Sequence, residues 1–168
     1  MENLNLILPE IFVSLSIMFL LIVGVFKKNS SKLIHNFSLI ILFISAGIVF
    51  NETLNIEKIL IFNESIIIDY LASFMKLITI LAALMALIVS SNYLKTFKIN
   101  KIEYPILIIC AVLGMMVMIS SNDLIVFYIG LELQSLSLYV LSSFNREEIK
   151  SSEAGLKYFV LSALSSGL

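Results

Sequence analysis

Charged residues are scarce in this 168-residue sequence, and cysteine and histidine are nearly absent. Asp, Glu, Lys and Arg make up 14% of the chain, against about 25% in ordinary soluble domains. The net charge of −1 gives no support to binding of nucleic acid. One cysteine, Cys110, forms neither an intrachain disulfide nor a cysteine cluster. His35 has no second ligand-type residue at a metal spacing, so no metal site is predicted.

Motifs for cofactors and covalent catalysis are missing as well. The sequence has no Gly-rich phosphate loop, no Cys-x-x-Cys and no nucleophile elbow. Hydrophobic residues instead make up 60% of the chain, against about 45–50% in soluble domains. This composition predicts an integral protein of the lipid bilayer.

Apolar runs predict an all-α, polytopic transmembrane helix bundle. About twenty helical residues cross the ~30 Å hydrocarbon core, and the first five runs are long enough to span it. The sixth run is still apolar at Leu168, so we expect a piece of a longer protein that supplies five full helices and the start of a sixth. Residues 1–168 are predicted to form one incomplete membrane domain. Its helices are expected at about residues 6–26, 33–50, 66–94, 104–120, 124–143 and 152–168.

Basic residues lie in alternate loops of this predicted bundle. They follow the first, third and fifth runs, whereas the remaining loops hold only Lys58. By the positive-inside rule the N-terminus lies outside. No Lys or Arg precedes Lys27, which argues for a retained first helix over a cleaved signal peptide. In the second loop, Ile56–Phe62 is rich in β-branched residues and predicts a short outer strand or hairpin. The basic loop residues are Lys27, Lys28, Lys32, Lys95, Lys98, Lys101, Arg146 and Lys150.

Glu132 is the most informative residue, because it lies near the middle of the fifth apolar run. A carboxylate at that depth costs on the order of 3 kcal/mol or more, and needs a partner, water or a bound proton. At about 100° per residue, a stripe of hydroxyls shares its side of the helix. Such a stripe either relays protons beside an acid or forms the hydrogen-bonded contact between two helices. The presence of Glu132 favours the proton relay. The stripe is Tyr128, Glu132, Ser135, Tyr139 and Ser142.

Lys157 in the sixth run is the predicted partner of Glu132. A short connection makes the fifth and sixth helices antiparallel neighbours, and the two residues fall at similar heights. The alternative is that Lys157 extends to the inner surface. The third run repeats the pattern with Asp69, Ser73 and Lys76 on one face. There Asp69 is either interfacial or part of the polar path, and Lys76 lies deeper.

Other polar and small residues are predicted to have structural roles. Glu10 follows Pro9 at the start of the first helix, where a negative charge complements the helix dipole. We therefore assign it a capping role. Gly114 and Gly130 are predicted to let two helices approach closely.

Several stretches resemble a known family. SSNDLIVFYIGLELQSLSLYVLSSF followed by SSEAGLKYFVLSALSSGL is similar to the subunit N family of bacterial proton-pumping NADH:quinone oxidoreductase, respiratory complex I, whose mitochondrial counterpart is NADH dehydrogenase subunit 2. The upstream stretches LPEI, FNESIIIDYLASFMKLITIL and YPILIICAVLGMMVMIS also resemble it. The resemblance covers nearly the whole chain.

The resemblance implies an antiporter-like fold of two inverted repeats with broken helices, of which this chain supplies the N-terminal third. It also implies that Glu132 and Lys157 form a charged pair in the proton-conducting part of the membrane arm. The family's DxxAxFxK pattern falls on Asp69, Ala72, Phe74 and Lys76. The later helices of the family, with their central lysines, are not in this sequence.

The implied function is a membrane-arm subunit that contributes to proton translocation coupled to electron transfer from NADH to quinone. The chain is then part of an enzyme without a redox centre of its own, and NADH, FMN, iron–sulfur clusters and quinone are expected in partner subunits. Its partners are the other membrane-arm subunits, in a bacterial inner membrane rather than a mitochondrial one. Two alternatives remain: a subunit of a multisubunit cation/proton antiporter, and a structural spacer of a membrane complex.

Overall fold

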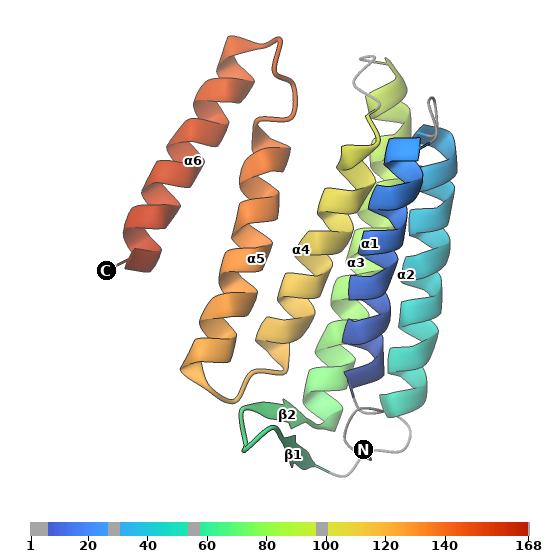
Figure 1. Cartoon of the computed structure of the whole chain (residues 1–168), viewed down its shortest axis with the longest axis vertical. Helices are drawn as coiled ribbons and strands as arrows, with labels where there is room; N and C mark the ends of the chain where they lie inside the picture. Colours follow the sequence, from blue (N-terminus) through green and yellow to red (C-terminus); the bar gives the residue numbers. More distant parts are fainter. Residues whose placement is uncertain (1–6, 27–30, 54–57, 97–100, 168) are drawn as a thin grey trace.

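Antiparallel helices and one hairpin make up the structure, a computed structural model that describes residues 7–26, 31–53, 58–96 and 101–167, apart from the side chain of Lys95. Each helix runs antiparallel to the next, so α1 and α3 begin at the end where α2 finishes (Figure 1). Lys27, Lys28, Lys98, Leu168 and the first residues of the predicted outer strand, from Ile56, lie outside the described residues. The elements are α1 (Leu8–Phe26), α2 (Ser31–Thr53), β1 (Ile59–Ile61), β2 (Ile66–Ile68), α3 (Tyr70–Thr96), α4 (Glu103–Ile119), α5 (Leu124–Ser142) and α6 (Ile149–Gly167).

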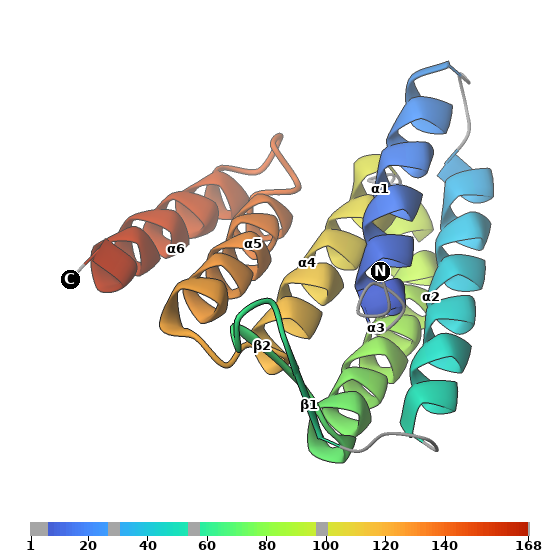
Figure 2. The same cartoon turned by 60° about the horizontal axis from the view of Figure 1, so that its bottom comes forward.

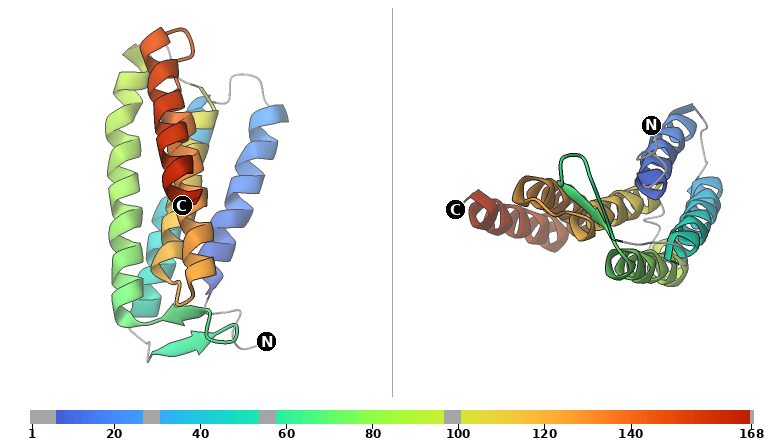
Figure 3. Two further views of the ribbon diagram at one scale, coloured as in Figure 1. Left: turned by 90° about the vertical axis from the view of Figure 1, so that its left-hand side faces the viewer. Right: turned by 90° about the horizontal axis from the view of Figure 1, so that it is seen from below.

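The buried core lies among the first four helices. Its fully buried members include Leu20 of α1, Leu42 of α2, Leu87 of α3 and Val112 of α4. Helices α5 and α6 contribute no residue to this cluster. Seen from below, α4, α5 and α6 form a row that extends away from α1, α2 and α3 (Figure 3). The helix that carries Glu132 is therefore held through α4 rather than by a shared core.

The outer surface of the bundle suits a bilayer. Four helices, α1, α2, α3 and α5, are long and apolar enough to cross a membrane. The apolar helix α4 has 17 residues, about 25 Å at 1.5 Å per residue. Large side chains such as Phe26 and Phe43 are exposed, which is costly in water and favourable in lipid. The predicted all-α, multi-pass membrane bundle is confirmed.

The predicted outer hairpin is present, and it changes where α3 begins. Strands β1 and β2 pair antiparallel, with Ile59 opposite Ile68 (Figure 2). The expected start of the third helix at residue 66 was wrong, because Ile66–Ile68 is a β-branched run that pairs as a strand. Helix α6 begins at Ile149, three residues before the start predicted near 152.

Two glycines set the contact between α4 and α5. A Cβ added to Gly114 would lie 2.6 Å from the backbone nitrogen of Gln134, and one added to Gly130 would lie 2.7 Å from that of Met118. Real Cβ atoms essentially never come so close to other atoms. The two backbones thus pack in direct contact, as the sequence predicted for Gly114 and Gly130.

Candidate functional site

The polar face of α5 turns partly toward its neighbours and partly outward. Ser135 and Tyr139 are buried, Glu132 is half-buried, and Tyr128 near the start of the helix is exposed. Among the described residues the Glu132 carboxyl makes no salt bridge and no side-chain hydrogen bond. The acid that the sequence singled out is thus half-buried without a counter-ion in this part of the chain.

The hydroxyls of the stripe bond chiefly to α5 itself. Ser135 Oγ donates to the Leu131 carbonyl at 2.8 Å, and Ser142 Oγ donates to the Tyr139 carbonyl at 2.8 Å. Such bonds satisfy a serine locally inside a helix. Each oxygen keeps lone pairs that accept hydrogen bonds. Ser135, three residues from Glu132, therefore offers an acceptor on the same side of the helix, whereas Ser142 lies about 15 Å from Glu132 along the axis.

Tyr139 belongs to the contact between α5 and α6. Its Oη donates to Ser162 Oγ at 2.5 Å. Its ring meets Tyr158 edge-on at 4.8 Å between centroids, and Phe159 at 5.6 Å. For this residue the structure has the hydrogen-bonded contact between two helices that the sequence left as the alternative.

Lys157 faces away from α5. Its Nζ lies 2.5 Å from Glu153 Oε1 on the same helix, and the two side chains are 68% and 56% exposed. No salt bridge among the described residues joins Lys157 to Glu132. The predicted pair is not formed in this structure.

Helix rotation explains why the pair is missing. Gly155 is the point of α6 closest to α5, because a Cβ there would collide with the side chain of Ser143. Tyr158 and Ser162, three and seven residues on, share that face. Lys157 is two residues on, which is about 200° around the helix. The prediction compared heights along the helices and left out this rotation.

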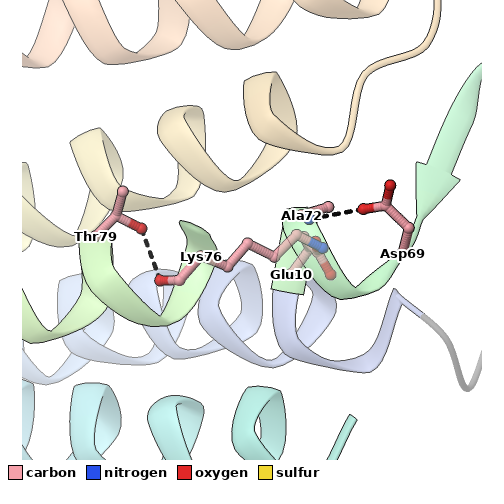
Figure 4. Close-up of polar contacts among 5 residues, drawn as sticks. All are labelled: Glu10, Asp69, Ala72, Lys76 and Thr79. Atoms are coloured by element: carbon pink, nitrogen blue, oxygen red, sulfur yellow. Dashed lines mark hydrogen bonds and ion pairs between the residues drawn. The ribbon is translucent and has the colours of Figure 1, made fainter. Parts of the chain in front are cut away.

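A second polar cluster lies at the hairpin end of the bundle. Lys76 of α3 is completely buried, and its Nζ lies 2.5 Å from Glu10 Oε1 of α1 (Figure 4). Glu10 does lie in the first turn of α1, as expected of a residue that complements the dipole. The predicted capping role missed its second part, as counter-ion of a buried lysine.

The geometry of α1 and α3 brings the two charges together. Both helices begin at the same end of the bundle (Figure 1). Lys76 lies six residues into α3, about 9 Å along its axis. Helical side chains point back toward the N-terminus, so the lysine extends to the first turn of α1. Comparing how far Lys76 and each acid lie from the outer ends of their helices would have indicated this pair from the sequence.

Asp69 has a capping role. Its Oδ1 accepts a hydrogen bond from the Ala72 backbone nitrogen at 2.7 Å (Figure 4). This satisfies one of the free N–H groups in the first turn of α3. Asp69 thus acts at the helix end, which was the interfacial alternative, while Lys76 is held below the surface by Glu10. In the described part of the chain no group of His, Cys, Asp and Glu is arranged to hold a metal ion.

Comparison with known proteins identifies close relatives. A family model described as "NADH:quinone oxidoreductase/Mrp antiporter, TM" matches residues 121–168, which hold α5 and α6. NADH-quinone oxidoreductase subunit N of Pelagibacter ubique is 64% identical over 168 residues, covering 100% of this chain and 36% of that protein. This chain therefore spans little more than a third of the length of that relative. The predicted resemblance to subunit N is confirmed.

Solved structures share the fold. A chain of respiratory complex I from Thermus thermophilus with bound aureothin has a TM-score of 0.79 at 21% identity, covering 95% of this chain and 34% of that one. A chain of the archaeal membrane-bound sulfane sulfur reductase, a respiratory membrane complex, also has a TM-score of 0.79, at 20% identity, covering 96% of this chain and 34% of that one. At these identities the matches show the fold, and two different complexes carry it.

Proposed function

We propose that this homologue of subunit N forms part of the membrane arm of a proton-translocating NADH:quinone oxidoreductase. The observation that carries the proposal is the 64% identity with subunit N of Pelagibacter ubique along the entire chain. The fold by itself does not decide, since a sulfane sulfur reductase complex also contains it. NADH, FMN, iron–sulfur clusters and quinone then belong to partner subunits, and this chain contributes to moving protons.

Within the chain, Glu132 is the group that we assign to the proton path. It is half-buried in α5, without a counter-ion among the described residues, and hydroxyls that accept hydrogen bonds lie on the same face. Ionisable groups at mid-membrane depth commonly lie on ion and proton pathways. Helix α5 keeps its place against α4 through backbone contact, so the acid stays at a fixed depth while it gains and loses its proton.

The test is Glu132→Gln in the complete oxidoreductase, reconstituted in sealed vesicles. We expect fewer protons moved per NADH oxidised, because glutamine keeps the shape and cannot carry the proton. Glu147→Gln is the matched control, since Glu147 is an exposed acid in the connection between α5 and α6. An unchanged proton-to-electron ratio and turnover in the Glu132 variant would remove this residue from the path.

A cation/proton antiporter subunit is the second candidate, because the matching family model covers both kinds of protein. Purification of the complete protein from its native membrane separates the two. Co-purification of a peripheral arm that oxidises NADH supports the oxidoreductase. Cation-driven proton exchange without such an arm supports the antiporter. A spacer without a transport role predicts that neutral residues at both 132 and 157 leave assembly and pumping intact.

We further propose a bacterial inner membrane as the location, with the hairpin end of the bundle outside. The support is the distribution of basic residues along the sequence. The start of α4 and the connection from α5 into α6 lie at the end opposite the hairpin (Figure 1), and these segments include the described residues Lys101, Arg146 and Lys150. Glu10 and Lys76 are then near the outer surface, and Glu132 is near the middle of the bilayer.

A further inference from the structure

We propose that α1, α2 and α3 enclose a second proton-binding site, distinct from Glu132, in which Glu52 holds a proton beside the ion pair of Glu10 and Lys76. Glu10 and Lys76 form the ion pair described above. Glu52 is in the last turn of α2, at the end of the bundle where α1 and α3 begin (Figure 1), and one of its carboxyl oxygens is buried. The site thus joins one residue from each of three helices.

The charge balance of this cluster requires a proton. Lys76 is the one buried cation among the described residues, and it faces two carboxyls. Lys58, Glu64 and Asp123 at the same end are exposed, and Asp69 caps α3. With every group ionised the cluster would carry an uncompensated negative charge. Taking such a charge out of water costs several kcal/mol, and one bound proton removes it.

The position of each acid indicates which one holds the proton. Glu10 is in ion-pair contact with Lys76, in the first turn of α1, where the positive end of the helix dipole stabilises a carboxylate. Glu52 is at the C-terminal end of α2, where the dipole has the opposite sign. We therefore assign the proton to Glu52 and the ion pair with Lys76 to Glu10.

Buried polar atoms that lack hydrogen bonds point to the same site independently. Ser73 is completely buried and its Oγ has no hydrogen-bond partner among the described residues. The buried serines Ser38, Ser45, Ser135 and Ser137 donate to a carbonyl of their own helix, whereas Ser120 Oγ at the end of α4 lacks a partner in the described part of the chain, as Ser73 Oγ does. Ser73 is one turn before Lys76 on the same face of α3.

The two carboxyls carry further atoms of this kind. Glu10 Oε2 and Glu52 Oε2 are buried without a hydrogen bond among the described residues. Buried polar atoms normally have partners, so each of these carboxyl oxygens is expected to bind a donor or to carry a proton. A protonated carboxyl is a donor, whereas an ionised one is an acceptor only. The Lys76 ammonium and the Ser73 hydroxyl are donors in either case, and protonation of Glu52 adds one more.

The experiment uses a carbodiimide, dicyclohexylcarbodiimide, which reacts with protonated carboxyls in apolar surroundings. The complete membrane complex is treated at neutral pH without turnover, and adducts are located by mass spectrometry of its peptides. We expect an adduct on Glu52, and about tenfold less on Glu10 and on the exposed control Glu147, since about 1.4 kcal/mol of preference for the charged form gives that ratio. Absence of an adduct on Glu52 would overturn the proposal.

Glu10→Gln tests whether the ion pair of Glu10 and Lys76 leaves the proton on Glu52. With Glu10 neutral, Lys76 needs Glu52 as its counter-ion, so labelling of Glu52 should fall about tenfold. If Glu52 merely lies in an apolar corner, its labelling stays unchanged, and the proposal fails. Lys76→Met gives the opposite expectation: both carboxyls lose their cation and both become labelled. If the adduct remains confined to Glu52 in that variant, the proposed role of Lys76 as counter-ion of Glu10 is refuted.

This site is independent of the proposed function, because the labelling is read at rest. A failure to pump in the Glu132 variant and a failure to label Glu52 are separate outcomes. If both hold, the chain has one proton-binding acid in mid-membrane on α5 and another near the outer end of α1, α2 and α3.

Discussion

Replacing Gly130 by alanine tests how the acid-bearing helix is held. Away from crowded sites, alanine stabilises a helix by about 0.5–1 kcal/mol relative to glycine. At Gly130 the new Cβ would lie 2.7 Å from Met118 N and 2.9 Å from the Gly114 carbonyl oxygen. Both are backbone atoms of α4, so no side chain can rotate to make room.

The size of the effect follows from that distance. Ordinary contacts begin at 3.4 Å, so α4 and α5 must separate by about 0.7 Å at this point. A gap of about 0.5–1 Å already loses a quarter to a half of the attraction between packed atoms. We expect Gly130→Ala to destabilise the full-length subunit by about 1–3 kcal/mol, as overpacking generally does.

Three further variants make this prediction specific. Gly47→Ala on α2 is the matched control, because a Cβ there has nothing within 4 Å, and it should stabilise slightly. Gly114→Ala should cost as much as Gly130→Ala, and the double variant less than the sum of the two. The reason is that each glycine touches the other's carbonyl, so one separation accommodates both methyl groups.

The assay is reversible unfolding of the full-length subunit by titration with denaturing detergent, followed by circular dichroism. The free energy of unfolding is compared across the four variants. If Gly130→Ala behaves like Gly47→Ala, the backbone contact between α4 and α5 does not hold the pair, and the reasoning is refuted. Proton pumping should fall along with stability, because the movement displaces Glu132.

Three further predictions concern single contacts and the direction of the chain. Tyr139→Phe removes the hydrogen bond to α6 and should lower the free energy of unfolding by about 1 kcal/mol in the same titration. The number of protons moved per NADH should stay unchanged. Loss of pumping in a stable variant would make Tyr139 part of the path. Asp69→Asn should retain stability and pumping, because asparagine also caps a helix, whereas Asp69→Ala should lower the free energy of unfolding by about 1 kcal/mol. A pumping defect in the asparagine variant would contradict a purely capping role. In a background with Cys110→Ala, Asn63→Cys should react with an impermeant maleimide added outside the cell. Glu147→Cys should react only after the membrane is opened. The reverse pattern would invert the proposed orientation.

The helical part of the fold could be predicted because apolar runs and bilayer thickness leave few alternatives. The close pair Gly114 and Gly130 was also predictable, since small residues in membrane helices usually mark contacts. The start of α3 was missed because an apolar run gives no sign of whether Ile66–Ile68 continues a helix or pairs as a strand. Only the pairing partner, β1 in the preceding loop, decides between these.

The charged pairs show a second limit of sequence reasoning. Depth along a helix follows from counting residues, whereas the direction in which a side chain points depends on how helices rotate against each other. Lys157 had the right depth for Glu132 and the wrong direction. Glu10 had the right depth for Lys76, but its position at the start of a helix already accounted for its charge through the helix dipole, so a lysine partner was not predicted. In both cases the missing information was which helix faces are in contact.

The relation between Glu132 and Lys157 can be tested directly by exchanging their charges. If the two residues paired directly, Glu132→Lys combined with Lys157→Glu would restore much of the pumping lost in either single variant. In the structure Lys157 pairs with Glu153 on the exposed side of α6. After the exchange, two carboxylates would stand four residues apart, which is destabilising, and the lysine in α5 would have no carboxylate opposite it. We therefore expect the double variant to pump no better than Glu132→Lys alone, measured as protons moved per NADH oxidised in vesicles. Rescue by the exchange would show that α6 in the working complex is rotated about its axis so that Lys157 faces α5, unlike its orientation in this structure.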